Sequence, residues 1–184
     1  SLVHVIPFYI MVEGLWSVAE SKIAPNINPD DLAVAILDSS DMKQVAETPG
    51  VKETEGVLLE RLNSGWICLG IKRENVVIAH MWCNLLACDS KLYYFNLNND
   101  EAYLTDARTI EMYRGKGLAP YLRLQFYKYL QNIGKHKVYS ITEFFNEPAM
   151  RFKMKLGARP ASLNVHVSML RKFNVRILLK QYNT

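Results

Sequence analysis

Two glycines set one residue apart, Gly115 and Gly117, mark the boundary between two patterns of apolar residues. The residues before them, Ala102–Met112, have the composition of a strand, whereas the apolar residues after them recur with the spacing of a helix face. At the start of a helix the first N–H groups have no internal acceptor, and the helix dipole adds partial positive charge. Glycine also lets a ligand approach the backbone closely. The stretch Tyr113–Ala119 therefore predicts a phosphate-binding turn, with an ordinary strand-to-helix turn as the alternative.

The charge distribution agrees with an anionic ligand in this half of the chain. Residues 1–100 carry seven Lys and Arg against 13 Asp and Glu, whereas residues 101–184 carry 15 against five. Arg114 and Lys116 add mobile positive charge beside the glycines. Nucleic acid and a phosphorylated cofactor are both candidates, but no basic repeat rich in aromatic residues supports nucleic acid. The Walker lysine motif and the longer dinucleotide fingerprint are absent from the sequence.

Length and composition favour one globular domain. The chain has 184 residues, 49% of them hydrophobic and 22% charged, and no apolar run is long enough to span a membrane. Leu2–Trp16 is apolar but contains Pro7 and Glu13 and lacks the basic start and cleavage site of a signal peptide, so we expect a buried segment. Three cysteines without zinc-ligand spacing (Cys68, Cys83 and Cys88) predict reduced, inert thiols, no metal and a cytoplasmic protein.

The remaining pattern predicts a mixed α/β domain over residues 31–184, preceded by an N-terminal extension over residues 1–30. A tight turn, Arg73-Glu74-Asn75, predicts an antiparallel hairpin. The expected strands are residues 32–37, 66–72, 76–86, 91–97, 102–112, 137–144, 163–169 and 175–182, and the expected helices are residues 41–47, 52–63, 120–134 and 146–156.

Two motifs then resemble a known family. Arg114-x-x-Gly117-x-Ala119 resembles the (Gln/Arg)-x-x-Gly-x-(Gly/Ala) signature of the GNAT superfamily of N-acetyltransferases. On the following helix, Asn146–Ala158 is similar to the Asn-x-x-Ala…Lys-Leu-Gly-Phe segment of that family. The two motifs occur in the family's order, and the resemblance covers roughly residues 31–182.

The resemblance implies an α+β fold with a twisted, mostly antiparallel sheet that is flanked by helices and splayed between its fourth and fifth strands, where the thioester of an acyl-CoA lies. It implies that the N–H groups of the turn hold the pyrophosphate, that the main chain before the turn pairs with the pantetheine, and that the next helix contacts the thiol end and the cofactor arm. The cofactor-binding residues so implied are Thr109, Ile110, Glu111, Arg114, Gly115, Lys116, Gly117, Leu118, Ala119, Asn146, Phe152 and Lys153.

The chemistry needs a group that takes the proton of the attacking amine. Asp106 is the first candidate for this base, because a carboxylate in the middle of a strand needs a reason to be there; a structural pair with Arg108 is the alternative. Glu143 closes the following strand and is the second candidate. His80 could also act as the base, although a hydrogen-bonded core histidine is the simpler interpretation. Glu101 is expected at the surface.

The sequence departs from the family at two positions. Lys153 occupies the position seven residues after Asn146 where the family commonly has a tyrosine acid. A lysine can stabilise a thiolate or bind phosphate, and Tyr139 could serve as the proton donor instead. Ala158 replaces the phenylalanine of the terminal Gly-Phe pair. These departures bear on the catalytic groups and not on the fold.

The function that follows is transfer of an acyl group from acetyl-CoA, or another acyl-CoA, to the amine of a small molecule, an amino sugar or an amino acid. The alternatives are a non-catalytic CoA-binding or interaction module, and an acyltransferase whose donor is a long-chain acyl-CoA or an acyl carrier protein. We expect no nucleic-acid partner. Alternating apolar residues in the last two strands, including Val165, Val175 and Ile177, predict an edge that a second copy could pair with as a homodimer.

Overall fold

The computed structural model describes residues 3–15, 25–169 and 173–183. Its contacts group the chain into two compact units, which are described separately. The first unit consists of residues 1–18, 86–103 and 135–184, and the second of residues 19–85 and 104–134. In the described ranges no helix has both the length and the hydropathy needed to cross a membrane.

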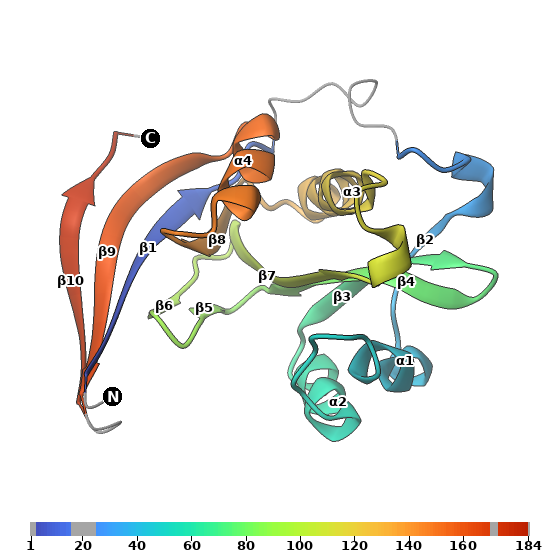
Figure 1. The fold of residues 1–184 in the computed structure, drawn as a ribbon, viewed down its shortest axis with the longest axis horizontal. Helices are drawn as coiled ribbons and strands as arrows, with labels where there is room; N and C mark the ends of the chain where they lie inside the picture. The colour runs from blue at the N-terminus through green and yellow to red at the C-terminus, as the bar shows by residue number, and fades with distance from the viewer. Residues whose placement is uncertain (1–2, 16–24, 170–172, 184) are drawn as a thin grey trace. The chain divides into compact units, whose positions relative to one another are not determined.

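Strands and helices together form the mixed α/β fold that the sequence predicts (Figure 1). The main sheet has the strand order β10-β9-β1-β8-β7-β4-β3-β2, and β5 and β6 pair separately. The strands are β1 (Val3–Val12), β2 (Ala33–Ile36), β3 (Ile67–Arg73), β4 (Val76–Asn84), β5 (Ala87–Asp89), β6 (Tyr94–Asn96), β7 (Glu101–Thr109), β8 (Lys137–Glu143), β9 (Arg159–Met169) and β10 (Phe173–Gln181). The helices are α1 (Met42–Ala46), α2 (Glu55–Asn63), α3 (Leu118–Asn132) and α4 (Glu147–Lys155), with short 3-10 turns at Pro29–Asp31, Ser39–Asp41 and Glu111–Tyr113.

Most strand pairs are antiparallel, as the GNAT resemblance implies. The pairs β1–β8, β1–β9, β9–β10, β2–β3 and β3–β4 are antiparallel, whereas β7 and β8 run parallel. The parallel register extends only from Glu101 opposite Lys137 to Tyr103 opposite Tyr139. Beyond Tyr103, β7 continues to Thr109 as part of the second unit.

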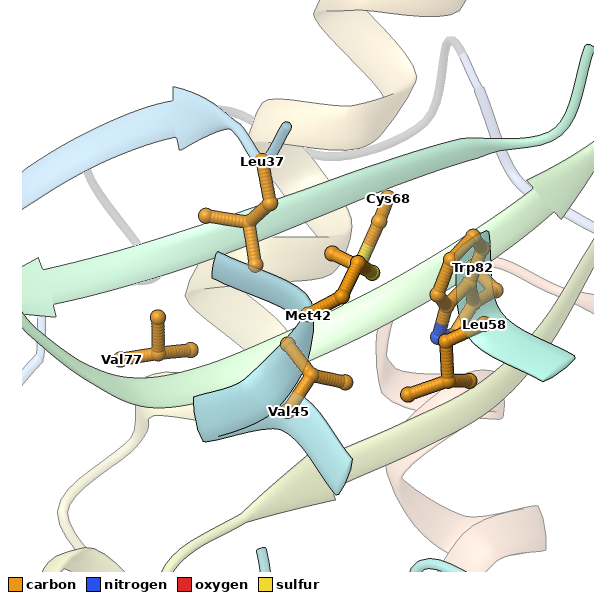
Figure 2. Packing of buried hydrophobic residues seen from close by; sticks show 7 residues of the cluster. All are labelled: Leu37, Met42, Val45, Leu58, Cys68, Val77 and Trp82. Carbon is orange, nitrogen blue, oxygen red and sulfur yellow. The ribbon is translucent and has the colours of Figure 1, made fainter. Parts of the chain in front are cut away.

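In the second unit, α1 and α2 lie on one side of β3 and β4, and α3 lies on the other side (Figure 1). The layer beneath α1 and α2 is a cluster of buried side chains that meet from these two helices and the adjoining strands (Figure 2). Burial of such side chains is the main source of folding free energy. The members of the cluster are Leu37, Met42, Val45, Leu58, Cys68, Val77 and Trp82.

In the first unit, β1 lies between β8 and β9 and is therefore part of the sheet. The sequence pattern predicts an N-terminal extension here and no strand. Proline lacks a backbone N–H and is rare within central strands, so the position of Pro7 needs an explanation. Pro7 is tolerated because it lies where the β1–β8 ladder ends: its carbonyl accepts the N–H of Phe144, and the last paired residues are Phe8 and Glu143. The burial expected for this segment is confirmed at Phe8 and Met11. The domain boundary after residue 30 stays a prediction.

The β1–β9–β10 region presents rows of aliphatic side chains on one face. Val5, Val167 and Val175 lie opposite one another across the three strands, and β10 is the edge strand. Val5 is 60% exposed and Val175 is 55% exposed, so this face has little cover from the described residues. Pairing of the edge with a second chain stays a prediction.

Gly70 provides a test of packing in the second unit. A Cβ at this position would lie 2.7 Å from both methyl carbons of the buried Leu37. Gly70→Ala should therefore lower the free energy of unfolding by about 1–3 kcal/mol, as overpacking does elsewhere. The matched control is Gly56→Ala in α2, where the nearest atom to the new Cβ is 4.0 Å away. In urea denaturation the control should be as stable as the parent or slightly more stable, and equal stability of Gly70→Ala would show that Leu37 moves freely.

Candidate functional site

The turn that precedes α3 has the backbone geometry that its glycines predict. Gly115 and Gly117 have φ angles of 75° and 76°, in the left-handed region that favours glycine. Gly117 is the N-cap of α3, and no side chain caps this helix. Pro120 falls in the first helical turn, where its missing N–H costs nothing.

The N–H groups of this turn are the main feature of the second unit. The N–H of Arg114 donates to Glu111, and helical bonding resumes where Tyr121 donates to the carbonyl of Gly117. Between these two bonds, no acceptor among the described residues takes the N–H groups of residues 115–119. We call residues 114–119 the cradle. Consecutive free N–H groups at a helix N-terminus favour an anion.

Three cationic side chains surround the cradle. The Nε of Arg114 donates to the carbonyl of Thr109 at 3.3 Å, and the ammonium of Lys116 lies 4.9 Å from the ring centroid of Tyr113. The hydroxyl of Tyr113 lies 3.4 Å from a guanidinium nitrogen of Arg73, which comes from β3. The sequence reasoning missed Arg73, because only the pairing of β3 in the fold brings it near a turn 40 residues away.

The end of β7 offers fewer free groups than the resemblance implies. The N–H of Ile110 donates to the carbonyl of Ile78 in β4 at 3.0 Å, so it is not available to pantetheine. Because N–H groups of successive strand residues point to opposite edges, that of Thr109, the last residue of β7, faces away from β4. Main-chain pairing with a ligand at the end of β7 would therefore use Thr109 and not the N–H of Ile110.

Asp106, the first candidate for the base, is held by an arginine of α2. Its carboxylate lies 2.8 Å from Arg61, and its φ of 48° is unusual for a non-glycine residue. Arg61 also contacts Glu53 at 3.3 Å and lies 5.0 Å from the centroid of the Trp66 ring. The expected pair with Arg108 is therefore wrong: the positive φ breaks the alternation on which that pair depended, and Asp106 pairs with Arg61.

His80 lies beside this ion pair, in the lining of a very small cavity that also includes Arg61, Asp106 and Arg108. The side chain is 1% exposed, and no described residue bonds its Nδ1. The expectation of a hydrogen-bonded core histidine is thus wrong at that nitrogen. Burial, and secondarily the charge of Arg108, lower the pKa of His80 to about 4, so the ring is neutral at pH 7.

In the first unit, Tyr139 donates its hydroxyl to Glu101 at 2.9 Å. Burial is the main cause that raises the pKa of Tyr139, with a contribution from Glu101 that Lys137 opposes. Glu101 is 7% exposed and also accepts the N–H of Asn98. The expectation of a surface Glu101 is therefore wrong, because its carboxylate lies inside a network of donors.

The other expected residues of this unit gather where β8 passes into α4. Glu143 is exposed at the end of β8, and its carbonyl accepts the N–H of Asn146. Asn146 caps α4, because its side-chain oxygen accepts the N–H of Ala149 at 3.2 Å. Its side-chain NH2 remains able to donate. Phe152 is half-buried on the same helix.

Lys153 points into the first unit. Its ammonium donates to the hydroxyl of Ser140 at 2.8 Å, to the hydroxyl of Thr142 at 2.6 Å and to the carbonyl of Ile141 at 3.1 Å. Ser140 in turn donates to the buried carboxylate of Glu13. All three N–H bonds of the ammonium are thus taken up within the protein. Lys153 has no donor left for a phosphate or a thiolate, so this geometry does not fit a cofactor-binding role.

Within the described ranges, no group of three or more His, Cys, Asp or Glu side chains is placed to hold a metal ion. Cys68, Cys83 and Cys88 are buried and form no disulfide with one another, as expected. Burial raises the pKa of Cys88 to about 12, which keeps this thiol protonated and unreactive.

The expected site residues fall into two groups, each inside one unit. The second unit contains the cradle, the end of β7, Asp106 and the additional Arg73, which contacts Tyr113 just before the cradle. The first unit brings Tyr139, Glu143, Asn146 and Lys153 onto β8 and α4.

Solved structures with the same fold are GNAT proteins. A tandem GNAT protein from the clavulanic acid biosynthesis pathway matches with a TM-score of 0.65 and 11% identity, over 90% of this chain and 54% of that one. A GNAT-family protein from Novosphingobium aromaticivorans matches with a TM-score of 0.61 and 17% identity, over 89% of this chain and 63% of that one. The ribosomal-protein-S18-alanine N-acetyltransferase from Escherichia coli matches with a TM-score of 0.56 and 14% identity, over 68% of this chain and 76% of that one. The chain thus spans less than two thirds of the first two proteins.

A search of curated proteins finds no match to the sequence. The family model described as "Acetyltransferase (GNAT) family" matches residues 36–158, which include the strand-turn-helix unit, the cradle and α4. Because this match covers more than half of the chain, the protein belongs to the acetyltransferase (GNAT) family.

Proposed function

We propose that this protein is an N-acyltransferase that uses acetyl-CoA as its acyl donor. The observation that carries the proposal is the run of free N–H groups in the cradle, with Arg114, Lys116 and Arg73 around it. This arrangement suits a pyrophosphate, because fixed N–H groups and mobile cations both favour oxyanions. Family membership supports the same donor, since an acyl-CoA is the co-substrate of GNAT enzymes.

The proposed reaction is direct attack of an amine on the thioester, which breaks the C–S bond and forms an amide. Asp106 is the proposed base, with Arg61 fixing the direction of its carboxylate. Glu143 is the second proposed base, because its carboxylate is exposed at the end of β8. Tyr139 is the proposed proton donor to the leaving thiolate. Its hydroxyl would have to exchange its bond to Glu101 for one to the sulfur.

We propose a small polar amine as the acceptor, such as an amino sugar or an amino acid. The support is the concentration of charge around Asp106, where Glu53, Arg61 and Arg108 lie on one small cavity. Such groups pair with the amine and the other polar groups of a small acceptor more readily than with an apolar one. The acceptors of the structural relatives are not transferred to this chain, because their identities with it are below 20%.

A non-catalytic CoA-binding module is the second candidate, and the position of Lys153 favours it. The family's tyrosine acid is replaced there by a lysine whose donors are all used. Release of free thiol from acetyl-CoA in the presence of amines separates the two functions, because only the enzyme produces it.

The first experiment is thermal unfolding with and without acetyl-CoA, free CoA and palmitoyl-CoA. A ligand present at 100 times its dissociation constant should stabilise the protein by about 2.7 kcal/mol. The proposal expects a clear upward shift of Tm with acetyl-CoA and with CoA. A larger shift with palmitoyl-CoA would identify a long-chain donor, and no shift with any of the three would contradict an acyl-CoA donor.

Gly117→Glu tests the cradle. The substitution places a carboxylate among the free N–H groups, so the affinity for CoA should fall at least tenfold, or about 1.4 kcal/mol. Gly134→Glu is the control at the other end of α3. It has the same charge and a similar backbone strain, since Gly134 has a φ of 77° and open space around it. Calorimetry should give parental affinity for the control, and equal affinities in both variants would refute the assignment.

Asp106→Asn tests the base. The amide keeps the shape of the side chain but cannot accept the proton, so turnover should fall about 100-fold or more while the CoA affinity stays within about twofold. Glu60→Gln is the control, because Glu60 is an exposed carboxylate of α2 that does not line the cavity around Asp106. Steady-state kinetics at parental rates in Asp106→Asn would remove this residue as the base.

Lys153→Met tests the role of the buried ammonium. Removing it leaves the carbonyl of Ile141 and the hydroxyls of Ser140 and Thr142 without this donor, so the free energy of unfolding should fall by about 3 kcal/mol. The control is Lys155→Met, at an exposed position of the same helix. CoA affinity of the folded protein should not change. Unchanged stability with a tenfold loss of CoA affinity would instead make Lys153 a cofactor ligand.

A further inference from the structure

The first unit contains a cavity of about 470 Å³ on the side of α4 formed by Glu147, Met150, Arg151 and Met154. Its volume lies within the range of small-molecule sites, about 300–1,000 Å³. None of the residues assigned above to acyl transfer lines it, and neither does Lys153. The cavity therefore has no role in the proposed reaction.

Aromatic rings form the floor of this cavity. The rings of Tyr9 and Phe144 are stacked, with centroids 5.5 Å apart and planes inclined by 20°. Tyr182 adjoins them, 6.5 Å from Tyr9 at 51°. Burial, with Tyr182 adding to it, raises the pKa of Tyr9, so the hydroxyl of Tyr9 stays protonated at neutral pH. Two stacked rings and a third, tilted ring give an aromatic surface that another ring can pack against.

One wall, which belongs to α4, is lined by two methionines one helical turn apart, Met150 and Met154. Methionine side chains are flexible and polarisable, and they contact aromatic rings favourably. The space between this wall and the floor is therefore adapted to a planar, apolar group. Met154 is 56% exposed, so the space is open to solvent on the helix side.

The charges decide which polar group such a ligand carries. Arg151 and Glu147 pair at 3.5 Å, but their side chains are more than 70% exposed, so this pair is weak and the guanidinium can turn to a ligand. The ammonium of Lys180 lies 4.8 Å from the ring centroid of Tyr182. The lining itself has one cation and one carboxylate, and Lys180, which is outside the lining, adds a second cation next to Tyr182. A site for an organic cation would need more carboxylates than cations around it. In addition, the Tyr182 ring already has the ammonium of Lys180 beside it.

We propose that this cavity is a second binding site, specific for an aromatic carboxylate. The ring lies between the aromatic floor and the methionine wall, and the carboxylate pairs with Arg151 in place of Glu147. Binding here is separate from acyl transfer and involves no covalent step.

The test is calorimetric titration of the full chain with three probes that share one ring: naphthoate, the neutral naphthamide and naphthyltrimethylammonium. Naphthoate should bind saturably with one site and about tenfold more tightly than naphthamide, as expected for one charge-assisted contact of about 1.4 kcal/mol. Tighter binding of the ammonium probe would overturn the proposal in favour of an aromatic cage. No saturable binding of naphthoate would overturn it as well.

Two pairs of variants place the binding in this cavity. Arg151→Gln should remove the preference for naphthoate over naphthamide, whereas Lys155→Gln, at an exposed position of α4 outside the lining, should keep it. Met154→Glu should weaken naphthoate at least tenfold, whereas Met112→Glu, at a methionine that is 72% exposed in the other unit, should have no effect. Equal affinities across either pair would refute the site. Parental Tm values would confirm that all four variants fold.

Discussion

Every backbone N–H needs an acceptor, and the way this chain meets that need determines where an anion can bind. Along the end of β7 the N–H of Ile110 is bonded to β4, and after it the N–H of Arg114 is bonded within the turn. The chain then enters α3 without a capping side chain, and both glycines hold the backbone at positive φ. The cradle is thus a place in the described part of the second unit where consecutive donors remain for a ligand. The cations around it are secondary to this backbone feature.

The first unit meets a different constraint, the high cost of a buried charge without partners. Lys153 comes from α4, Ser140 and Thr142 come from β8, and Glu13 follows β1. These contacts join three segments that are far apart in sequence. At the position that the family commonly gives to a tyrosine, this chain thus has a lysine whose hydrogen bonds connect α4 to β8.

Much of the fold could be predicted from local pattern. Gly117 and Pro120 predict where α3 begins, and Asn146 predicts where α4 begins. These predictions are possible because caps and turns depend on neighbouring residues in the sequence. Strand β1 was missed because Pro7 interrupts its pattern. Whether a proline is tolerated there depends on where the β8 ladder ends, and this is a property of the paired strands.

The sequence by itself determined the cradle, because free N–H groups at a glycine-rich helix start are a local property of the backbone. It also determined the alternation of strands and helices and the family resemblance. Tertiary structure alone decided the partners of the charged groups. Arg61 rather than Arg108 pairs with Asp106, Glu101 is buried beside Tyr139, and Lys153 points to β8. The physical reason is that ion pairs and buried hydrogen bonds depend on distances between segments, which periodicity along one segment does not contain.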